Sequence, residues 1–535
     1  MSDIIARITG WARSHPGLSV LVLGLVSACG YPPLHLWWLA IPAVAGFVAL
    51  LREAKSWRGA MWLGWLFGWA HLTLANNWIA TAFTFQAEMP AFFGWLAVPL
   101  LCIYLAIYPA LAALVAHLIG RGGGLLRFGT VLAGAWIVTE WLRGWVFTGY
   151  PWPPLGMLVL GDWKAEGWAA LLPWLGTYAL SGFVILFASL LGWLLVQRRW
   201  VVLGTSTAVL VIGMLFPAIR VTDPANGIPY RLVQPLLKQE EIDDPAKFEE
   251  QFERIARLTA PAQAASPLVL WPESGVPDFL EVGYPQSFYD RMTAGGDPAF
   301  ARRRIAATIG PESALLTGVI NLNFEEKDGF VRVVSARNSV IAMNDQGETT
   351  GEYSKAHLVP YGEYLPMRTV LEPLGLSRLV AGSIDYVAGP GPATIDLGRH
   401  GKAGVQICYE IVFSGQVVDA NDRPDYIFNP SNDGWFGAWG PPQHLAHARM
   451  RAIEEGLPVL RSTTTGISAV IDANGIVRQH IARGEAGAVS GFIPPAHAPT
   501  LFARLGNALP LIWSAILLLL GAALPRWLAR RGARG

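Results

Sequence analysis

The heptapeptide GVQICYE, residues 404–410, places a cysteine directly behind a short apolar run with the character of a β-strand. Cys408 is the only cysteine between residues 219 and 505, and the other two, Cys29 and Cys102, lie in long apolar stretches. Domains exported to an oxidising compartment usually pair their cysteines or lack them. If this region is exported, its solitary thiol is a candidate nucleophile, with a buried apolar side chain as the alternative.

The composition predicts that one part of the chain lies in lipid and another part in water. Hydrophobic residues make up 53% of the 535 residues and charged residues only 15%, and the charges are concentrated between about residues 218 and 505. This pattern predicts a membrane region at 1–218, a soluble domain at 219–505, and a last span with a basic tail at 506–535. The net charge of +1 comes with no basic stripe, so nucleic acid is not an expected partner.

Apolar runs of about 20 residues predict eight membrane spans. They lie near 17–31, 34–51, 59–80, 91–118, 126–147, 167–196, 200–217 and 507–525. The first two are short and are separated only by residues 30–33, so they could form a tight transmembrane hairpin or a re-entrant pair. A cleavable signal is a further alternative for this N-terminus, because residues 26–29 resemble a lipoprotein cleavage box.

Lysine and arginine predict the orientation, because short cytoplasmic loops retain them. They fall before span one, in every second loop and after span eight: Arg7, Arg13, Arg52, Lys55, Arg58, Arg121, Arg127, Arg198, Arg199, Arg526, Arg530, Arg531 and Arg534. The alternate connections hold few lysines and arginines: the first is uncharged, the second has only Glu88, and the third has Arg143 and Lys164. Both termini are therefore predicted to be cytoplasmic and the soluble domain to lie outside.

The soluble region predicts one α/β domain, because strand-like and helix-like segments alternate along it. The expected strands are 230–234, 268–271, 315–320, 339–343, 351–353, 403–407, 426–429, 459–460, 468–471 and 477–479, and the expected helices are 245–258 and 443–455. A turn at 344–347 predicts a hairpin that leads to Lys355. Glu273, Lys355 and Cys408 each follow a strand, so we expect them to meet at one rim of a sheet.

This order of glutamate, lysine and cysteine resembles the nitrilase superfamily, which implies a four-layer αββα sandwich. The membrane runs, together with EWLRG at 140–144, GYPW at 149–152 and HLVPYGE at 357–363, resemble the apolipoprotein N-acyltransferase family over essentially the whole chain. That resemblance implies a monomeric bacterial inner-membrane enzyme, free of cofactor and metal, with a periplasmic catalytic domain. It implies acyl transfer from a phospholipid, through a cysteine thioester, to the N-terminal amine of a diacylglyceryl apolipoprotein.

The chemistry of the three residues fits this expectation. A neutral thiol reacts weakly, so Cys408 needs a base, and Glu273 can take its proton and return it to the leaving alkoxide. Lys355 can face the oxyanion of the tetrahedral intermediate, a contribution typically worth about 3 kcal/mol. A tethered nitrilase-like amidase or hydrolase would share these residues but has no evident need for eight spans. A transporter is the weakest alternative.

Further residues have predicted supporting roles. The resemblance implies that Glu363 positions Glu273 or Lys355. Glu410 could orient the site or pair with an arginine, and Tyr409 could offer its backbone N–H to the oxyanion. Candidate lipid contacts are Trp435, Phe436, Arg143 and Trp78, with pairing of Arg143 to Glu140 as the alternative. His444 and His447 are spaced i, i+3, but no further ligands at matching spacing accompany them, so no metal is expected.

Overall fold

The computed structural model describes residues 9–85, 92–217, 227–260, 266–327, 329–374 and 384–523. It divides into two compact units. The helical unit comprises 1–80, 92–218 and 504–535, and the α/β unit comprises 81–91 and 219–503. The charged residues predicted at Arg7, Glu88 and 526–534 lie outside the described residues.

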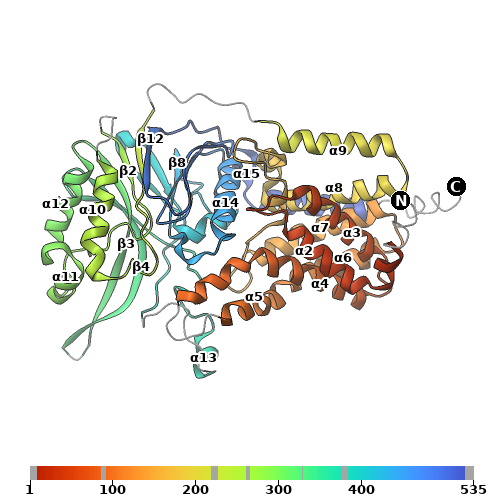
Figure 1. Cartoon of the computed structure of the whole chain (residues 1–535), viewed down its shortest axis with the longest axis horizontal. Coiled ribbons are helices and arrows are strands. Elements are labelled where there is room, and N and C mark those ends of the chain that lie inside the picture. Colours follow the sequence, from red (N-terminus) through yellow and green to blue (C-terminus); the bar gives the residue numbers. More distant parts are fainter. Residues whose placement is uncertain are drawn as a thin grey trace. The chain divides into compact units, whose positions relative to one another are not determined.

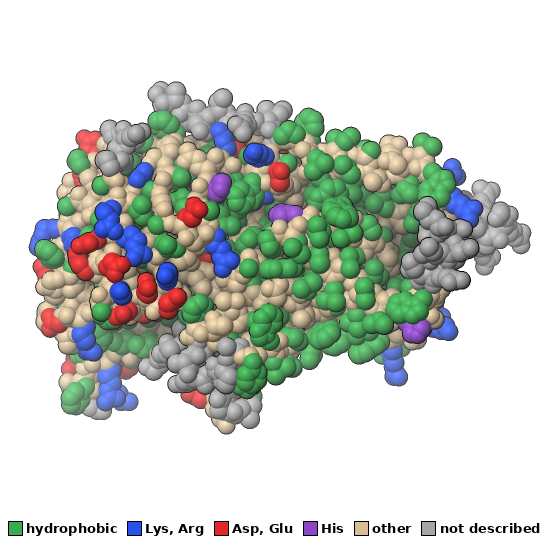
Figure 2. All heavy atoms as spheres, in the orientation of Figure 1, with side chains coloured by type: hydrophobic (Ala, Val, Ile, Leu, Met, Phe, Trp, Pro, Cys, Tyr) green, Lys and Arg blue, Asp and Glu red, His purple; other side chains and the backbone are tan. Residues whose placement is uncertain are grey.

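The helical unit consists of apolar helices (Figure 1). They are α2 (Pro16–Ala28), α3 (Trp37–Arg52), α4 (Trp57–Ala75), α5 (Phe92–Leu105), α6 (Ile107–Gly120), α7 (Leu125–Arg143), α8 (Leu172–Val196), α9 (Trp200–Leu215) and α16 (Ala508–Ala523), with 3₁₀ turns at Leu155–Val159 and Trp168–Leu171. A further 3₁₀ segment, Asn77–Phe85, begins in this unit and ends in the α/β unit. On its visible face, hydrophobic side chains dominate, whereas charged side chains gather on the α/β unit (Figure 2). This surface suits a hydrocarbon environment.

Three helical segments among the described residues are long and apolar enough to cross a bilayer: Phe92–Gly120, Leu125–Arg143 and Trp168–Val196. Four shorter helices, α2, α3, α9 and α16, are also apolar. The first two predicted spans are separate helices that pack against each other. A membrane-type helical region is therefore present, and the count of eight spans stays a prediction.

The fourth predicted span is not one continuous helix. α5 ends at Leu105 and α6 begins at Ile107. Pro109 explains the break, because its ring clashes with the carbonyl of the residue four positions earlier, which is Leu105. The sixth span is also kinked, at Gly176, where φ is 72°.

Small residues let these helices approach closely. A Cβ placed on Gly64 of α4 would lie 2.6 Å from the Cβ of Ala113 on α6. Gly134 of α7 faces α16 in the same way, and Ser514 Oγ donates a hydrogen bond of 2.7 Å to the Gly134 carbonyl. Close backbone contact and polar bonds between helices supply the association that the hydrophobic effect cannot supply inside lipid.

The α/β unit contains two six-stranded sheets. The first has the order β12 (Gly487–Phe492), β1 (Pro229–Gln234), β2 (Leu268–Leu270), β3 (Ala314–Lys327), β4 (Phe330–Asn344), β5 (Thr349–Ser354). The second has the order β11 (Val477–Ile481), β10 (Ser468–Ile471), β9 (Val459–Thr463), β8 (Tyr426–Ser431), β7 (Lys402–Val405), β6 (Thr394–Asp396). In each sheet three parallel strands, β1–β2–β3 and β7–β8–β9, are flanked by antiparallel ones.

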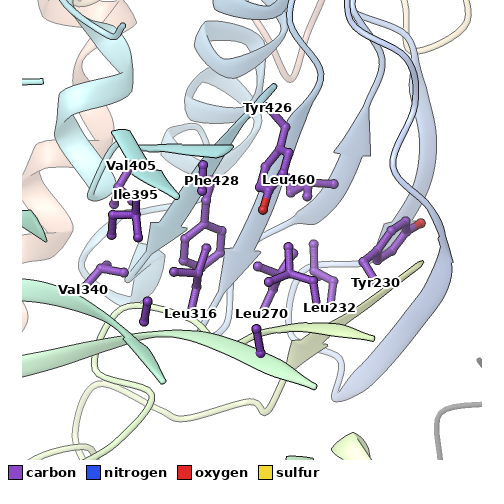
Figure 3. Close-up of a cluster of buried hydrophobic side chains, with 14 of the residues drawn as sticks. Tyr230, Leu232, Leu270, Leu316, Val340, Ile395, Val405, Tyr426, Phe428 and Leu460 are labelled. Atoms are coloured by element: carbon purple, nitrogen blue, oxygen red, sulfur yellow. The ribbon is translucent and has the colours of Figure 1, made fainter. Parts of the chain in front are cut away.

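The two sheets pack face to face around one apolar core (Figure 3). Leu270 and Leu316 of the first sheet face Phe428 and Leu460 of the second. Because side chains alternate along a strand, Val269 points the other way, into a cluster shared with α10 (Phe248–Thr259) and α12 (Pro298–Ile309). On the second sheet, α14 (Gly440–Glu455) packs against β9 and β10. The result is the expected αββα sandwich.

Candidate active site

Glu273 lies in the turn that follows β2. Its backbone rests against β3 because that strand has a glycine there: a Cβ on Gly318 would lie 2.7 Å from Glu273 Cα. The carboxylate is buried and accepts two hydrogen bonds of 2.7 Å, one at Oε1 from Asn338 Nδ2 and one at Oε2 from the backbone N–H of Asn432. Both oxygens are therefore held in place before any substrate arrives.

Lys355 directly follows β5, and its side chain is only 1% exposed. Its Nζ lies 2.8 Å from Glu363 Oε1 and 3.8 Å from Glu273 Oε1. Burial alone lowers the pKa of Lys355, but the two carboxylates outweigh it, so the pKa lies above its ordinary value. The site therefore contains a permanent ammonium group between two carboxylates.

Asn338 connects these three side chains, although the sequence did not single it out. Its Nδ2 donates to Glu273 Oε1 at 2.7 Å and to Glu363 Oε1 at 3.1 Å, and its carbonyl accepts from the backbone N–H of Lys355 at 2.9 Å. The sequence offered one signal, because Asn338 is an amide just before the apolar run of β4. The predicted hairpin pairs that strand with the strand before Lys355. That pairing alone does not reveal Glu273 as a second partner.

Cys408 comes from the second sheet, three residues after β7 ends. The expectation that one sheet rim carries all three residues is therefore wrong, because Glu273 and Lys355 follow strands of the first sheet. Cys408 has φ +51°, a left-handed conformation that costs a non-glycine residue about 1–2 kcal/mol. Such strain often marks a functional position.

The thiol of Cys408 is kept neutral at rest. Its side chain is buried, and burial, followed by the charge of Glu273, raises its pKa well above the ordinary value. The charge of Lys355 and the backbone N–H of Asn432 act in the opposite direction and only partly compensate. A nucleophile in this state needs an acceptor for its proton.

Glu410 ties together the two loops of the site. Its Oε2 accepts from the backbone N–H of Ile407 at 2.7 Å, and its Oε1 accepts from three donors: Tyr353 Oη at 2.8 Å, Ala356 N at 2.7 Å and His357 N at 3.1 Å. These donors lie on the turn that carries the cysteine and on the strand and loop around the lysine. Of the two roles left open by the sequence, the geometry matches orientation of the site.

The predicted aromatic residues lie around this cluster. Tyr409 is buried next to the cysteine. Trp435 and Phe436 are half-buried: the ring of Trp435 meets that of Phe85 edge-on at 5.6 Å, and the ring of Phe436 lies 5.5 Å from His444. These contacts are with other side chains of the protein and do not test contact with lipid. The lipid role of Trp435 and Phe436 therefore stays a prediction.

The two other candidate lipid contacts, Arg143 and Trp78, are buried within the helical unit. Arg143 Nη2 lies 3.6 Å from Glu140 Oε1, and the guanidinium donates to the carbonyls of Trp152 and Pro153. The indole of Trp78 lies 4.7 Å from that of Trp152. The pairing alternative therefore describes Arg143 in this structure, and contact with a lipid headgroup stays a prediction.

The histidine pair considered for zinc has other partners. His444 Nδ1 lies 3.0 Å from Asp433 Oδ1, and Nε2 lies 3.0 Å from the carbonyl oxygen of Cys408. Within the described residues, no group of three or more histidine, cysteine or acidic side chains is arranged to hold a metal ion. His444 and His447 both lie on α14, whose residues from Gln443 to Glu455 are all buried.

The α/β unit, an αββα sandwich with a buried cysteine near a glutamate and a lysine, has the features of the carbon–nitrogen hydrolase class. Residues 233–496 match the carbon–nitrogen hydrolase family, and residues 23–191 match the N-terminal domain family of apolipoprotein N-acyltransferase. The chain is 30% identical to apolipoprotein N-acyltransferase of Rhodopseudomonas palustris, covering 96% of this chain and 95% of the relative. It is 33% identical to that of Allorhizobium ampelinum, covering 89% of each. The chain belongs to the apolipoprotein N-acyltransferase family.

Solved structures that match this chain include an amidase and a member of the nitrilase superfamily. The amidase from Nesterenkonia sp. AN1, with an acetamide moiety added covalently at its active-site cysteine, is 15% identical with a TM-score of 0.35, covering 55% of this chain and 96% of the amidase. Nit3 of Saccharomyces cerevisiae, from the nitrilase superfamily, is 19% identical with a TM-score of 0.34, covering 50% of this chain and 90% of Nit3.

Proposed function

We propose that this enzyme transfers a fatty acyl chain from a membrane phospholipid to the free α-amino group of the N-terminal diacylglyceryl-cysteine of an apolipoprotein. The acyl chain is carried in between as a thioester on Cys408. The observation that carries the proposal is the cluster of Cys408, Glu273 and Lys355 in a chain that matches the family over nearly its full length. The reaction uses no cofactor or metal.

In the first half-reaction, Glu273 takes the proton of the Cys408 thiol, and the sulfur attacks the ester carbonyl. Negative charge then grows on the carbonyl oxygen, where the Lys355 ammonium stabilises it. When the intermediate collapses, the C–O bond breaks and the lysophospholipid alkoxide takes the proton back from Glu273. In the second half-reaction, the amine attacks the thioester and gives a proton to Glu273, the C–S bond breaks, and Glu273 returns that proton to the sulfur.

The same proposal places the enzyme in the bacterial cytoplasmic membrane, with the α/β unit on the periplasmic side, both termini in the cytoplasm and a single chain as the working unit. The apolar helices and the alternation of basic loops along the sequence support it. A site reached from the bilayer suits both substrates, because each buried CH₂ of an acyl chain contributes about 0.8 kcal/mol to staying in lipid.

The test is to incubate the purified protein with phospholipid alone and to analyse the Cys408 peptide by mass spectrometry. We expect an added acyl mass at Cys408 that disappears when a synthetic diacylglyceryl peptide is supplied, with N-acylated peptide as product. Cys408→Ala should show neither signal. Rapid release of free fatty acid without transfer to the peptide would instead identify a hydrolase.

A further inference from the structure

The backbone carbonyl of Cys408, the proposed nucleophile, has a side-chain hydrogen-bond partner. His444, on α14 and fully buried, lies with Nε2 3.0 Å from the carbonyl oxygen of Cys408. A carbonyl oxygen only accepts hydrogen bonds, so Nε2 must carry the proton and donate. This bond acts on a residue whose backbone is left-handed, with φ +51°.

The other ring nitrogen is held by a buried ion pair. Nδ1 lies 3.0 Å from Asp433 Oδ1 and 3.0 Å from Arg461 Nη2. Arg461 in turn donates to both oxygens of Asp433, at 2.9 and 2.8 Å, and all three side chains are inaccessible to solvent. With the proton on Nε2, Nδ1 can accept from the guanidinium, which orients the ring toward the cysteine.

The ion pair also adjoins the base of the site. Asp433 follows Asn432, whose backbone N–H donates to Glu273 Oε2 at 2.7 Å. Two consecutive residues thus contact the carboxylate of Glu273 and the imidazole of His444, from the same turn after β8. A buried ion pair contributes little to stability relative to apolar packing, and is better explained by the geometry that it imposes.

We propose that His444 is a positioning residue for the nucleophile. Its hydrogen bond to the Cys408 carbonyl holds the left-handed turn that directs the thiol toward Glu273. The inference rests on the proposed function, because aim matters only if the thiol reacts. His444 touches neither substrate nor reacting sulfur in this role. It acts through the backbone of Cys408.

Two substitutions separate the nitrogens of the ring. In His444→Gln, the side-chain amide nitrogen can reach the position of Nε2 and keep donating to Cys408. In His444→Asn, the amide can reach only the position of Nδ1, so its oxygen can still accept from Arg461 and the bond to Cys408 is lost. Each variant would be assayed for the single-turnover rate of acyl transfer from phospholipid to Cys408, for the rate of alkylation of the Cys408 peptide by iodoacetamide, and for melting temperature.

We expect His444→Asn to melt near the wild-type temperature but to acylate about 100-fold more slowly, because a misplacement near 1 Å costs on that order. His444→Gln should stay within about 10-fold of wild type. Acylation by His444→Asn at the wild-type rate would overturn the proposal, as would an equal loss in both folded variants. If the asparagine variant does not fold, the glutamine variant decides alone, and a folded but inactive glutamine variant refutes the inference.

The alkylation arm needs no lipid, so it separates the two proposals. If wild-type protein forms no acyl adduct, the proposed function fails. Slower alkylation of Cys408 in the asparagine variant than in the glutamine variant would still support the positioning role, and equal alkylation rates in wild type and both variants would refute it.

Discussion

Replacing Glu410 by glutamine keeps the shape of the side chain but removes its charge and one of its two acceptor oxygens. The carboxylate receives one backbone N–H at Oε2 and three donors at Oε1. The amide NH₂ of the substituted side chain cannot accept, so it must face a donor in either orientation. The less costly orientation places it against the N–H of Ile407, which loses its partner inside the protein.

The cost follows from that single contact. A hydrogen bond to a charged group is worth roughly 1.5–3 kcal/mol, and the unsatisfied N–H adds to the loss. If about 1.4–2.8 kcal/mol of this is felt in the transition state, Glu410→Gln slows acylation of Cys408 by about 10- to 100-fold, since each 1.4 kcal/mol is a factor of ten. The loss falls on the rate and not on lipid binding, because Glu410 is buried and is bonded to the loops that it joins.

The assay is the single-turnover appearance of acyl adduct on Cys408 at saturating phospholipid, with melting temperature measured in parallel. Tyr353→Phe is the matched control, since it removes one of the four donors to Glu410 but leaves no backbone N–H unpaired, and should cost about 1 kcal/mol at most. A folded Glu410→Gln protein that acylates at the wild-type rate would refute the view that these bonds position the site.

Three further outcomes follow from the same structure. Lys355→Met should slow acylation by about 10²–10³-fold with a small change in KM, because an oxyanion partner is lost, and unchanged single-turnover rates would contradict that role. Phe428→Ala, in the core between the sheets, should destabilise the α/β unit by about 3–5 kcal/mol, with little change for the exposed Phe330→Ala, as measured by thermal unfolding. Burial raises the pKa of Glu455 to about 7 from 4.5, so the folded chain retains a proton there that the unfolded chain releases. The melting temperature of the wild type relative to that of Glu455→Gln should therefore fall as pH rises from about 4.5 to about 7 and level off above, and a difference that does not change with pH would contradict the assignment.

The sequence predicts those parts of the site that depend on local pattern. An apolar run followed by a polar residue marks the positions of Glu273 and Cys408, because strands that are buried on both faces read as mostly apolar runs. The turn at 344–347 likewise marks the hairpin before Lys355, and β4 and β5 form it. These features need no knowledge of which strands are neighbours.

The remaining parts depend on pairing between distant segments. That Glu273 and Cys408 belong to different sheets could not be read from strand order, since consecutive strands pair in most folds. Asn338 and His444 are bonded to residues that lie 65 and 36 positions away, respectively. No spacing rule connects such partners, so an amide in the middle of β4 and a histidine on a buried helix carried no signal of their roles.

The charges around Cys408 are compatible with a neutral thiol as the proposed nucleophile. Glu273 and Glu363 carry two negative charges and Lys355 one positive, so the cluster has a net charge of −1. Losing the thiol proton to solvent would add a second negative charge inside the protein, which burial makes costly. Passing the same proton to Glu273 leaves the total at −1 and creates the thiolate beside the ammonium. The arrangement therefore favours transfer of the thiol proton to Glu273 over its loss to solvent. A thiol that stays neutral until then avoids the side reactions that a permanent thiolate would undergo.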